Sequence, residues 1–262
     1  MIKHSLIVSA VLTCLAAGSA VAADMPVKTA PYHNARQGCA NFGGFYVGGQ
    51  AGVSHYTHSF TDLDSFGVEW IDSFLPQDVS HTGRGALAGA QAGYNWQSGC
   101  TVFGIESDWA WTNAKASTLL TDGTTTDNRD EVDHIRVTSK LQWFGTTRVR
   151  TGVVVDNLML YVTGGLAYAN FKRDFEYFED NGPTTEHFAR SRTRFGWTGG
   201  VGTEWAINQN WSLKSEVLYM QFQKDETTDT STVIAPDVQT RFKNEDSVWA
   251  ARIGLNYRFG AY

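Results

Sequence analysis

The chain has 262 residues, a formal net charge of −6, 26 glycines and 13% aromatic residues, with only 5 prolines. The acidic balance argues against a nucleic-acid partner. Many aromatic residues together with many glycines are typical of a β-barrel with aromatic girdles and tight backbone corners. The composition is therefore unusual for a soluble domain of this length.

Residues 1–23 have the pattern of an export signal. Lys3 precedes an apolar run from Leu6 to about Ala17, and small residues follow it up to Ala23. The run is too short to span a bilayer, which needs about 20 residues. We expect cleavage after Ala23, which removes Lys3 and changes the net charge from −6 to −7. Residues 24–42 then form a short periplasmic lead-in.

From residue 43 onward the chain repeats one pattern, in which ten or more residues alternate between apolar and small or polar side chains before a break. A period of two is typical of a β-strand with two different faces. Eight segments show it, near residues 43–56, 84–96, 101–112, 137–153, 158–171, 193–206, 211–222 and 246–259. We therefore predict an all-β fold, an eight-stranded antiparallel transmembrane β-barrel over residues 43–262.

The breaks between these segments alternate in length. Short ones fall at residues 97–100, 154–157 and 207–210. Long polar ones fall at about residues 57–83, 113–136, 172–192 and 223–245. Short periplasmic turns and long extracellular loops characterise outer-membrane barrels. This pattern predicts the outer membrane of a Gram-negative bacterium, with both termini periplasmic because the strand number is even.

One face of each segment is predicted to contact lipid, with aromatic residues near the segment ends. The predicted lipid-facing sets are the even-numbered residues from Ala86 to Trp96, the odd-numbered residues from Leu141 to Val153, the set Leu160, Val162, Leu166 and Tyr168, and the odd-numbered residues from Trp249 to Phe259.

The opposite faces carry the charges of these segments. They hold four acids and five bases, which are Glu106, Asp108, Arg148, Arg150, Glu204, Lys214, Glu216, Arg252 and Arg258. A soluble barrel of the lipocalin kind would place the charges outside and the apolar face inside. In a membrane, an Arg or Lys that faces lipid at the midplane costs about 2–4 kcal/mol. We therefore predict a charge network in the lumen, with each charge paired, because an unpaired buried charge is expensive.

Eight strands leave an interior just wide enough for side chains to fill. The network is therefore predicted to plug the barrel, and no metal site or catalytic site is predicted. The alternative is a narrow porin-like channel, in which the charges would line a path for small ions.

Two cysteines follow the signal, Cys39 just before the first strand and Cys100 in the first short turn. Both lie on the periplasmic side of the predicted topology, and exported proteins meet an oxidising compartment. A disulfide at this rim is one interpretation. Two unpaired thiols are the other, since spacing alone does not fix geometry.

Several stretches resemble the small outer-membrane β-barrel family of alphaproteobacteria, whose members are labelled porin-family or outer-membrane immunogenic proteins. They are GGFYVGGQAG, GAQAGYNWQ, FGIESDW, LQWFGTTRVRTG, LYVTGGLAYA, FGWTGGVGTEWAINQNWSLKSEVLY and ARIGLNYRF, which together run over nearly the whole mature chain. The resemblance implies a role in envelope integrity, surface loops that act as antigens, and outer-membrane lipid and lipopolysaccharide as surroundings.

The resemblance also implies that the barrel-assembly machinery reads a terminal aromatic residue. Family members often end on the aromatic of the last strand, whereas here Tyr262 ends the chain, three residues after Phe259. The predicted assembly signal therefore comprises Tyr257, Phe259 and Tyr262. The sequence does not decide whether Phe259 or Tyr262 is the terminal aromatic residue that is read.

Some members of this family bind haem, so a haem-binding surface protein is a further alternative. The candidate contacts are His55, Tyr56, His58 and His81, near the outer ends of the first two strands. A haem pocket needs an axial His or Tyr and an apolar wall. No paired spacing marks a metal site here, so we predict no cofactor and keep haem as the exception.

An enzyme is not predicted. Ser54 with His55 and Ser80 with His81 are sequence neighbours, and adjacent residues of a strand point to opposite faces. The long loops include the acidic, Thr-rich stretches at residues 121–133 and 224–233, which indicate solvated surface. Host or phage surface molecules are expected to bind at these long loops.

Overall fold

The computed structural model describes residues 38–62, 78–121, 133–179, 186–230 and 239–259. The predicted signal at residues 1–23 lies outside these ranges, and only residues 38–42 of the predicted lead-in fall within them. None of the described residues belongs to a helix long and apolar enough to cross a membrane.

The described chain folds into antiparallel strands. Their bounds are β1 Gly44–Asp62, β2 Asp78–Ser98, β3 Thr101–Thr112, β4 Lys115–Thr121, β5 Asp133–Val155, β6 Leu158–Glu179, β7 Glu186–Ala206, β8 Trp211–Phe222, β9 Asp225–Thr230 and β10 Gln239–Arg258.

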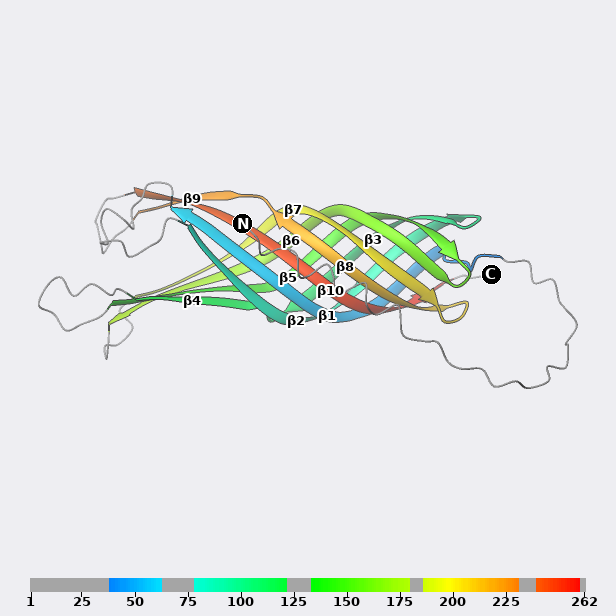
Figure 1. Ribbon diagram of the computed structural model, residues 1–262, viewed down its shortest axis with the longest axis horizontal. Coiled ribbons are helices and arrows are strands. Elements are labelled where there is room, and N and C mark those ends of the chain that lie inside the picture. Colours follow the sequence, from blue (N-terminus) through cyan, green and yellow to red (C-terminus); the bar gives the residue numbers. More distant parts are fainter. Residues whose placement is uncertain (1–37, 63–77, 122–132, 180–185, 231–238, 260–262) are drawn as a thin grey trace, which may run out of the picture. The chain divides into compact units, whose positions relative to one another are not determined.

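The strands close into a barrel (Figure 1). Strands that follow one another in the chain pair, except that β3 pairs with β5 and β8 with β10, and β1 pairs with both β2 and β10, which joins the two ends of the sheet. β4 continues the line of β3 along β5, and β9 continues the line of β8 along β10. If β3 with β4 and β8 with β9 are each counted as one interrupted strand, the barrel has eight strands. This confirms the eight-stranded antiparallel barrel. We call its two ends the turn end, with the short turns, and the loop end.

The strands run further toward the loop end than the sequence pattern predicts. Parts of each predicted long loop, at about residues 57–83, 113–136, 172–192 and 223–245, belong to strands, so these loops are shorter than predicted. The acidic stretch at residues 224–233, for example, contains β9. Beyond the loop-end aromatic band the inner face carries polar side chains such as His58 and Asp246, so the alternation of apolar and polar residues that marks a strand disappears while the backbone ladder continues.

A β-bulge corrects one of the predicted lipid-facing sets. The register of β5 against β6 shifts between Leu141 and Trp143. Leu141 therefore faces the lumen, where it is 1% exposed, whereas Trp143 lies on the outer wall. The prediction that both share one face was wrong, because a bulge inserts an extra residue and inverts the parity beyond it.

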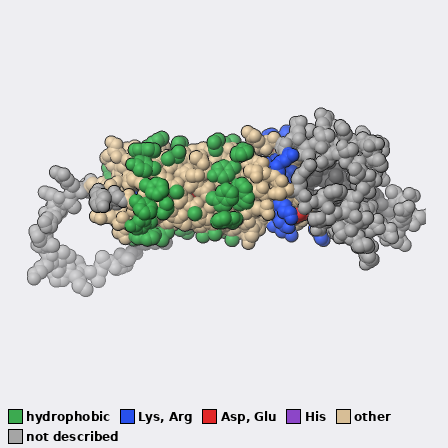
Figure 2. All heavy atoms as spheres, turned by 180° about the vertical axis from the view of Figure 1, so that it is seen from behind, with side chains coloured by type: hydrophobic (Ala, Val, Ile, Leu, Met, Phe, Trp, Pro, Cys, Tyr) green, Lys and Arg blue, Asp and Glu red, His purple; other side chains and the backbone are tan. Residues whose placement is uncertain are grey.

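Aromatic side chains form two bands on the outer wall, and Figure 2 shows apolar side chains gathered in two zones. The turn-end band includes Phe45, Trp96, Phe103, Trp205, Trp211 and Phe259, and the loop-end band includes Trp109, Trp111, Phe195, Trp197 and Trp249. Two such girdles are what a membrane-spanning barrel requires. Tyr257 and Phe259 meet edge to face in the turn-end band, with ring centroids 5.0 Å apart, whereas Tyr262 lies outside the described residues.

Candidate functional site in the barrel lumen

Strand alternation turns the predicted charges into the lumen. Eight of them, Glu106, Asp108, Arg148, Arg150, Glu204, Lys214, Glu216 and Arg252, are at most 3% exposed. They come from β3, β5, β7, β8 and β10, and each lies on the same face of its strand as its buried neighbours. Four acids thus meet four bases in one layer, which we call the charge layer.

Arg148 joins three carboxylates in the charge layer. Its guanidinium donates to Glu216 at 2.9 Å, to Asp108 at 3.1 Å and to Glu106. Arg252 approaches two of the same groups from the opposite wall, at 3.0 Å from Asp108 and 2.8 Å from Glu216. Two of these bonds, Arg148 with Glu216 and Arg252 with Asp108, connect β5 with β8 and β10 with β3, which share no backbone ladder.

The other two bases complete the pairing. Lys214 donates to both oxygens of Glu106, at 2.8 and 2.9 Å. Arg150 donates to Glu204 at 3.0 Å. Hydrogen bonds to charged groups are worth about 1.5–3 kcal/mol each. Pairing on this scale offsets the cost of removing eight charges from water.

Neutral side chains satisfy the remaining oxygens of the charge layer. None of these side chains was predicted from the sequence. Tyr46 donates to Glu106 at 2.7 Å, Tyr161 to Glu216 at 3.0 Å, and Thr146 to Asp108 at 2.6 Å. Ser212 and Asn256 both donate to Glu204. The available signal was parity, because Thr146 alternates with Arg148 and Ser212 with Lys214 on the same strand faces.

Apolar layers cover the charge layer on both sides, which the prediction of a charge-filled lumen did not include. The larger layer, toward the loop end, contains Tyr56, Leu87, Leu141, Phe144, Phe171, Leu218, Met220, Phe222 and Val248. The smaller layer, toward the turn end, contains Phe42, Val102, Val154, Met159, Tyr161 and Ala206. These residues are at most 7% exposed, so the lumen is filled at several levels.

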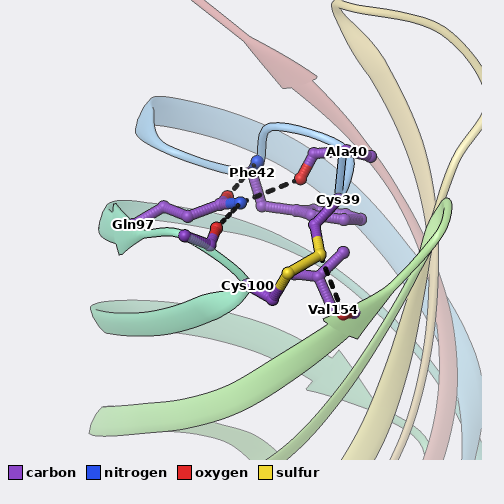
Figure 3. Close-up of a disulfide and its surroundings, with 7 residues drawn as sticks. Cys39, Ala40, Phe42, Gln97, Cys100 and Val154 are labelled. Carbon is purple, nitrogen blue, oxygen red and sulfur yellow. Dashed lines mark hydrogen bonds between the residues drawn. A yellow bond between two sulfur atoms is a disulfide. The ribbon is translucent and has the colours of Figure 1, made fainter. Parts of the chain in front are cut away.

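The segment before β1 folds into the turn end of the lumen. Cys39 is joined to Cys100 by a disulfide, with the two Cα atoms 5.4 Å apart (Figure 3). The Gln97 side chain holds this segment, because it accepts from the Phe42 N–H at 2.6 Å and donates to the Ala40 carbonyl at 3.0 Å. Phe42 is fully buried, and the guanidinium of Arg258 lies 4.8 Å from its ring centroid. The segment therefore closes the turn end.

A second ionic cluster lies at the loop end of the lumen, around Asp246. This carboxylate accepts hydrogen bonds from Tyr56 at 2.7 Å and His58 at 2.7 Å. It also accepts from Arg173 at 3.1 Å and Arg194 at 2.9 Å. Burial lowers the pKa of His58, so its ring is neutral at neutral pH and donates through Nδ1.

The predicted haem contacts divide between the two faces of the barrel wall. His55 lies on the outer wall, opposite Arg84 in the register. Tyr56, His58 and His81 face the lumen, where Tyr56 and His58 are bonded to Asp246 and the two histidine rings lie 5.0 Å apart. Within the described ranges, no group of three or more His, Cys, Asp or Glu is placed to hold a metal ion.

The chain is similar to a family model and to curated outer-membrane proteins. Residues 10–259 match the sequence model of the outer membrane protein beta-barrel domain. The chain is 34% identical over 259 residues to the 31 kDa outer-membrane immunogenic protein of Brucella melitensis biotype 1, covering 97% of this chain and 99% of that protein. It is 29% identical over 168 residues to the 22 kDa outer membrane protein of Rhizobium leguminosarum bv. viciae, covering 64% of this chain and 63% of that protein.

Solved structures resemble the chain more distantly. The outer membrane protein OprG from Pseudomonas aeruginosa has 15% identity and a TM-score of 0.46, with 85% of this chain and 98% of that chain covered. Similarity of this degree carries no argument about activity.

Replacement of Arg148 tests the charge layer. In Arg148→Gln, Glu106, Asp108 and Glu216 lose a shared counter-charge, so we expect a loss of about 3–5 kcal/mol in the free energy of unfolding. Urea unfolding in vesicles, followed by the heat-modifiable gel shift, measures it. The matched control is Val149→Ala on the outer wall, where the side chain is 52% exposed. Equal unfolding midpoints for the two variants would contradict a paired network.

Asp246 should make stability depend on acid pH. It lies three residues from Trp249, on the loop-end side of the loop-end aromatic band and outside the lipid-facing set Trp249 to Phe259. Burial alone would raise its pKa, but the hydrogen bond from His58 and the charges of Arg173 and Arg194 outweigh burial and lower the pKa to about 2. A lowered carboxyl pKa stabilises the fold fully above about pH 4, and this stabilisation is lost as the pH falls toward 2.

The Asp246→Asn variant lacks this titration. We expect it to be less stable than the wild type at pH 7, and to lose less stability than the wild type between pH 4 and pH 2. Thermal unfolding across that interval measures the difference between the two proteins. Parallel pH profiles would show that Asp246 does not carry the effect.

Proposed function

The chain belongs to the outer membrane protein β-barrel family, and on this basis we propose that it is a sealed structural barrel that reinforces the outer membrane and displays loops at the cell surface. The turn end then faces the periplasm and the loop end faces the exterior. The observation that carries the proposal is the filling of the lumen, in which a paired charge layer lies between two apolar layers.

Ion passage would meet two obstacles in this lumen. The apolar layers offer a hydrated ion no replacement ligands, and their side chains are nearly inaccessible. The charge layer holds both signs in equal number and in direct contact, whereas conducting filters usually present one sign of charge or a ring of carbonyls. An ion that entered would have to break pairs such as Arg148 with Glu216. These features favour a plug over the narrow channel.

The same network supports a mechanical role. Buried pairs between Arg252 and Asp108, and between Arg150 and Glu204, cross the lumen and connect strands that do not neighbour each other. The disulfide adds a covalent link across 61 residues, which by loop entropy is worth about 4 kcal/mol. A barrel stiffened in this way suits a role in envelope integrity.

The display role rests on the loop end. The strands continue beyond the loop-end aromatic band, as β4 and β9 do. Relatives of the chain are named immunogenic proteins, which supports recognition of loops at this end by host molecules.

Planar-bilayer recording tests the seal. For the folded chain with its disulfide intact, we expect no steady unitary conductance steps at neutral pH in potassium chloride. A sixteen-stranded porin inserted by the same procedure is the positive control, because its lumen is open. Reproducible steps from the folded chain, absent from a heat-unfolded sample, would favour the channel instead.

The same distinction appears in cells. If the chain reinforces the envelope, cells that lack it should become more sensitive to detergent, and its expression should restore resistance without speeding uptake of small hydrophilic solutes. Faster solute uptake on expression, with no change in detergent resistance, would contradict the structural role.

A further inference from the structure

Four basic residues form a continuous row on the outer wall. In the strand register Arg84 of β2 lies opposite Lys115 of β4, Lys115 opposite Lys140 of β5, and Lys140 opposite Lys172 of β6. Figure 2 shows Lys and Arg side chains gathered beyond the second apolar zone. We call these four residues the basic row.

The basic row points away from the lumen. Ala114 and Ala116, on either side of Lys115, are buried inside, and so are Leu141 next to Lys140 and Phe171 next to Lys172. Arg84 and Lys115 are exposed, and the side chains of Lys140 and Lys172 are 41% and 37% exposed. All four charges are therefore available to a ligand at the surface of the barrel.

Such a row is unfavourable without a counter-ion. Neighbouring strands lie about 4.8 Å apart, and like charges directly opposite each other destabilise a sheet. Asp174 contacts Lys140 at 3.0 Å and Lys172 at 3.3 Å. Among the described residues, Arg84 and Lys115 form no ion pair. Among the residues that the structure describes, one acid thus contacts a row of four bases, and this excess of positive charge favours an anion.

The row lies at the height of lipid headgroups. Lys115 follows Trp111 of the loop-end band by four residues, and Lys140 precedes Trp143 by three. Interfacial aromatic residues mark the boundary between acyl chains and headgroups. The row therefore lies on the outer wall of the barrel at the height where the acyl chains of the outer leaflet end, on the side of the membrane toward the loop end.

An apolar surface for acyl chains adjoins the row on the same strands. Trp109 and Trp143 stack with ring centroids 4.1 Å apart, and Tyr168 lies 6.4 Å from Trp109. Tyr168 covers Gly145, where an added Cβ would come within 2.3 Å of its ring. Cations above and a broad aromatic wall below match a ligand with an anionic head and several acyl chains.

We propose that the basic row and this aromatic wall bind a phosphorylated glycolipid of the outer leaflet, of the lipid A type, with its phosphate groups on Arg84, Lys115, Lys140 and Lys172. Arg and Lys are the side chains that bind phosphate, Arg by paired hydrogen bonds and Lys as a point charge. The aromatic wall argues for a lipid over free phosphate. This binding does not depend on whether the lumen is sealed.

A pair of lysines on other strands provides a matched control. Lys224 and Lys243, near the loop end of β8 and in β10, both contact Glu245, at 2.7 and 3.6 Å. These two lysines share an acid close by and form no row across four strands. Lys224→Gln/Lys243→Gln removes two positive charges, as Arg84→Gln/Lys115→Gln does, but leaves the basic row intact.

The test measures binding of bisphosphorylated lipid A to the folded full chain in neutral detergent micelles, by native mass spectrometry. We expect Arg84→Gln/Lys115→Gln to weaken binding on the order of tenfold or more, since each basic residue near an anionic surface contributes substantially. The control variant should stay within about twofold of the wild type. A heat-modifiable gel shift establishes that both variants are folded.

Two comparisons on the wild type need no variant. Lipid A stripped of its phosphates should bind on the order of tenfold more weakly than the bisphosphorylated form, and millimolar inorganic phosphate should not displace the latter. Equal binding of both lipids would overturn the proposal, as would equal losses in the two double variants. Displacement by inorganic phosphate alone would show an anion site without lipid specificity, which also overturns it.

Discussion

The pairing of buried charge inside a barrel too narrow for bulk water is the interaction on which the rest of the structure depends. A charge on the lipid side is costly, and a charge in the lumen is tolerable only with a partner. Arg148, bonded to Glu106, Asp108 and Glu216, therefore fixes which face of β5 is inside. Because side chains alternate with a period of two, this fixes the register of neighbouring strands as well.

The layers on either side of the charges follow from the same constraint. Apolar side chains exclude water from the network, and a lower local dielectric strengthens each pair. The disulfide-linked segment with Phe42 closes one end, and the cluster around Asp246 occupies the other. The pairing of buried charge is thus the common origin of the sealed lumen, the stiffness of the barrel and the strands that continue beyond the membrane. The basic row lies on the outer wall, which this arrangement leaves in contact with lipid.

Much of this could be predicted from the sequence, because Arg148, Arg252 and their partners break an otherwise apolar alternation. The apolar lumen layers were not predicted, although alternation places Leu87 and Phe144 opposite the lipid-facing sets, because the lumen face was assigned from charge alone. The bulge at Leu141 leaves no local signal, and a strand extension such as β9, with the sequence DETTDT, has no apolar alternation. The basic row could not be predicted from the sequence, because its members are far apart in the chain and become neighbours only through the strand register.

A crystal structure of the folded protein, at a resolution that shows ordered water in the lumen, would test the central claim most directly. The account predicts that Arg148 and Arg252 are bonded to Glu106, Asp108 and Glu216, and that water is interrupted at both apolar layers. An unbroken file of water from one end of the barrel to the other, with these charges solvated and apart, would contradict it.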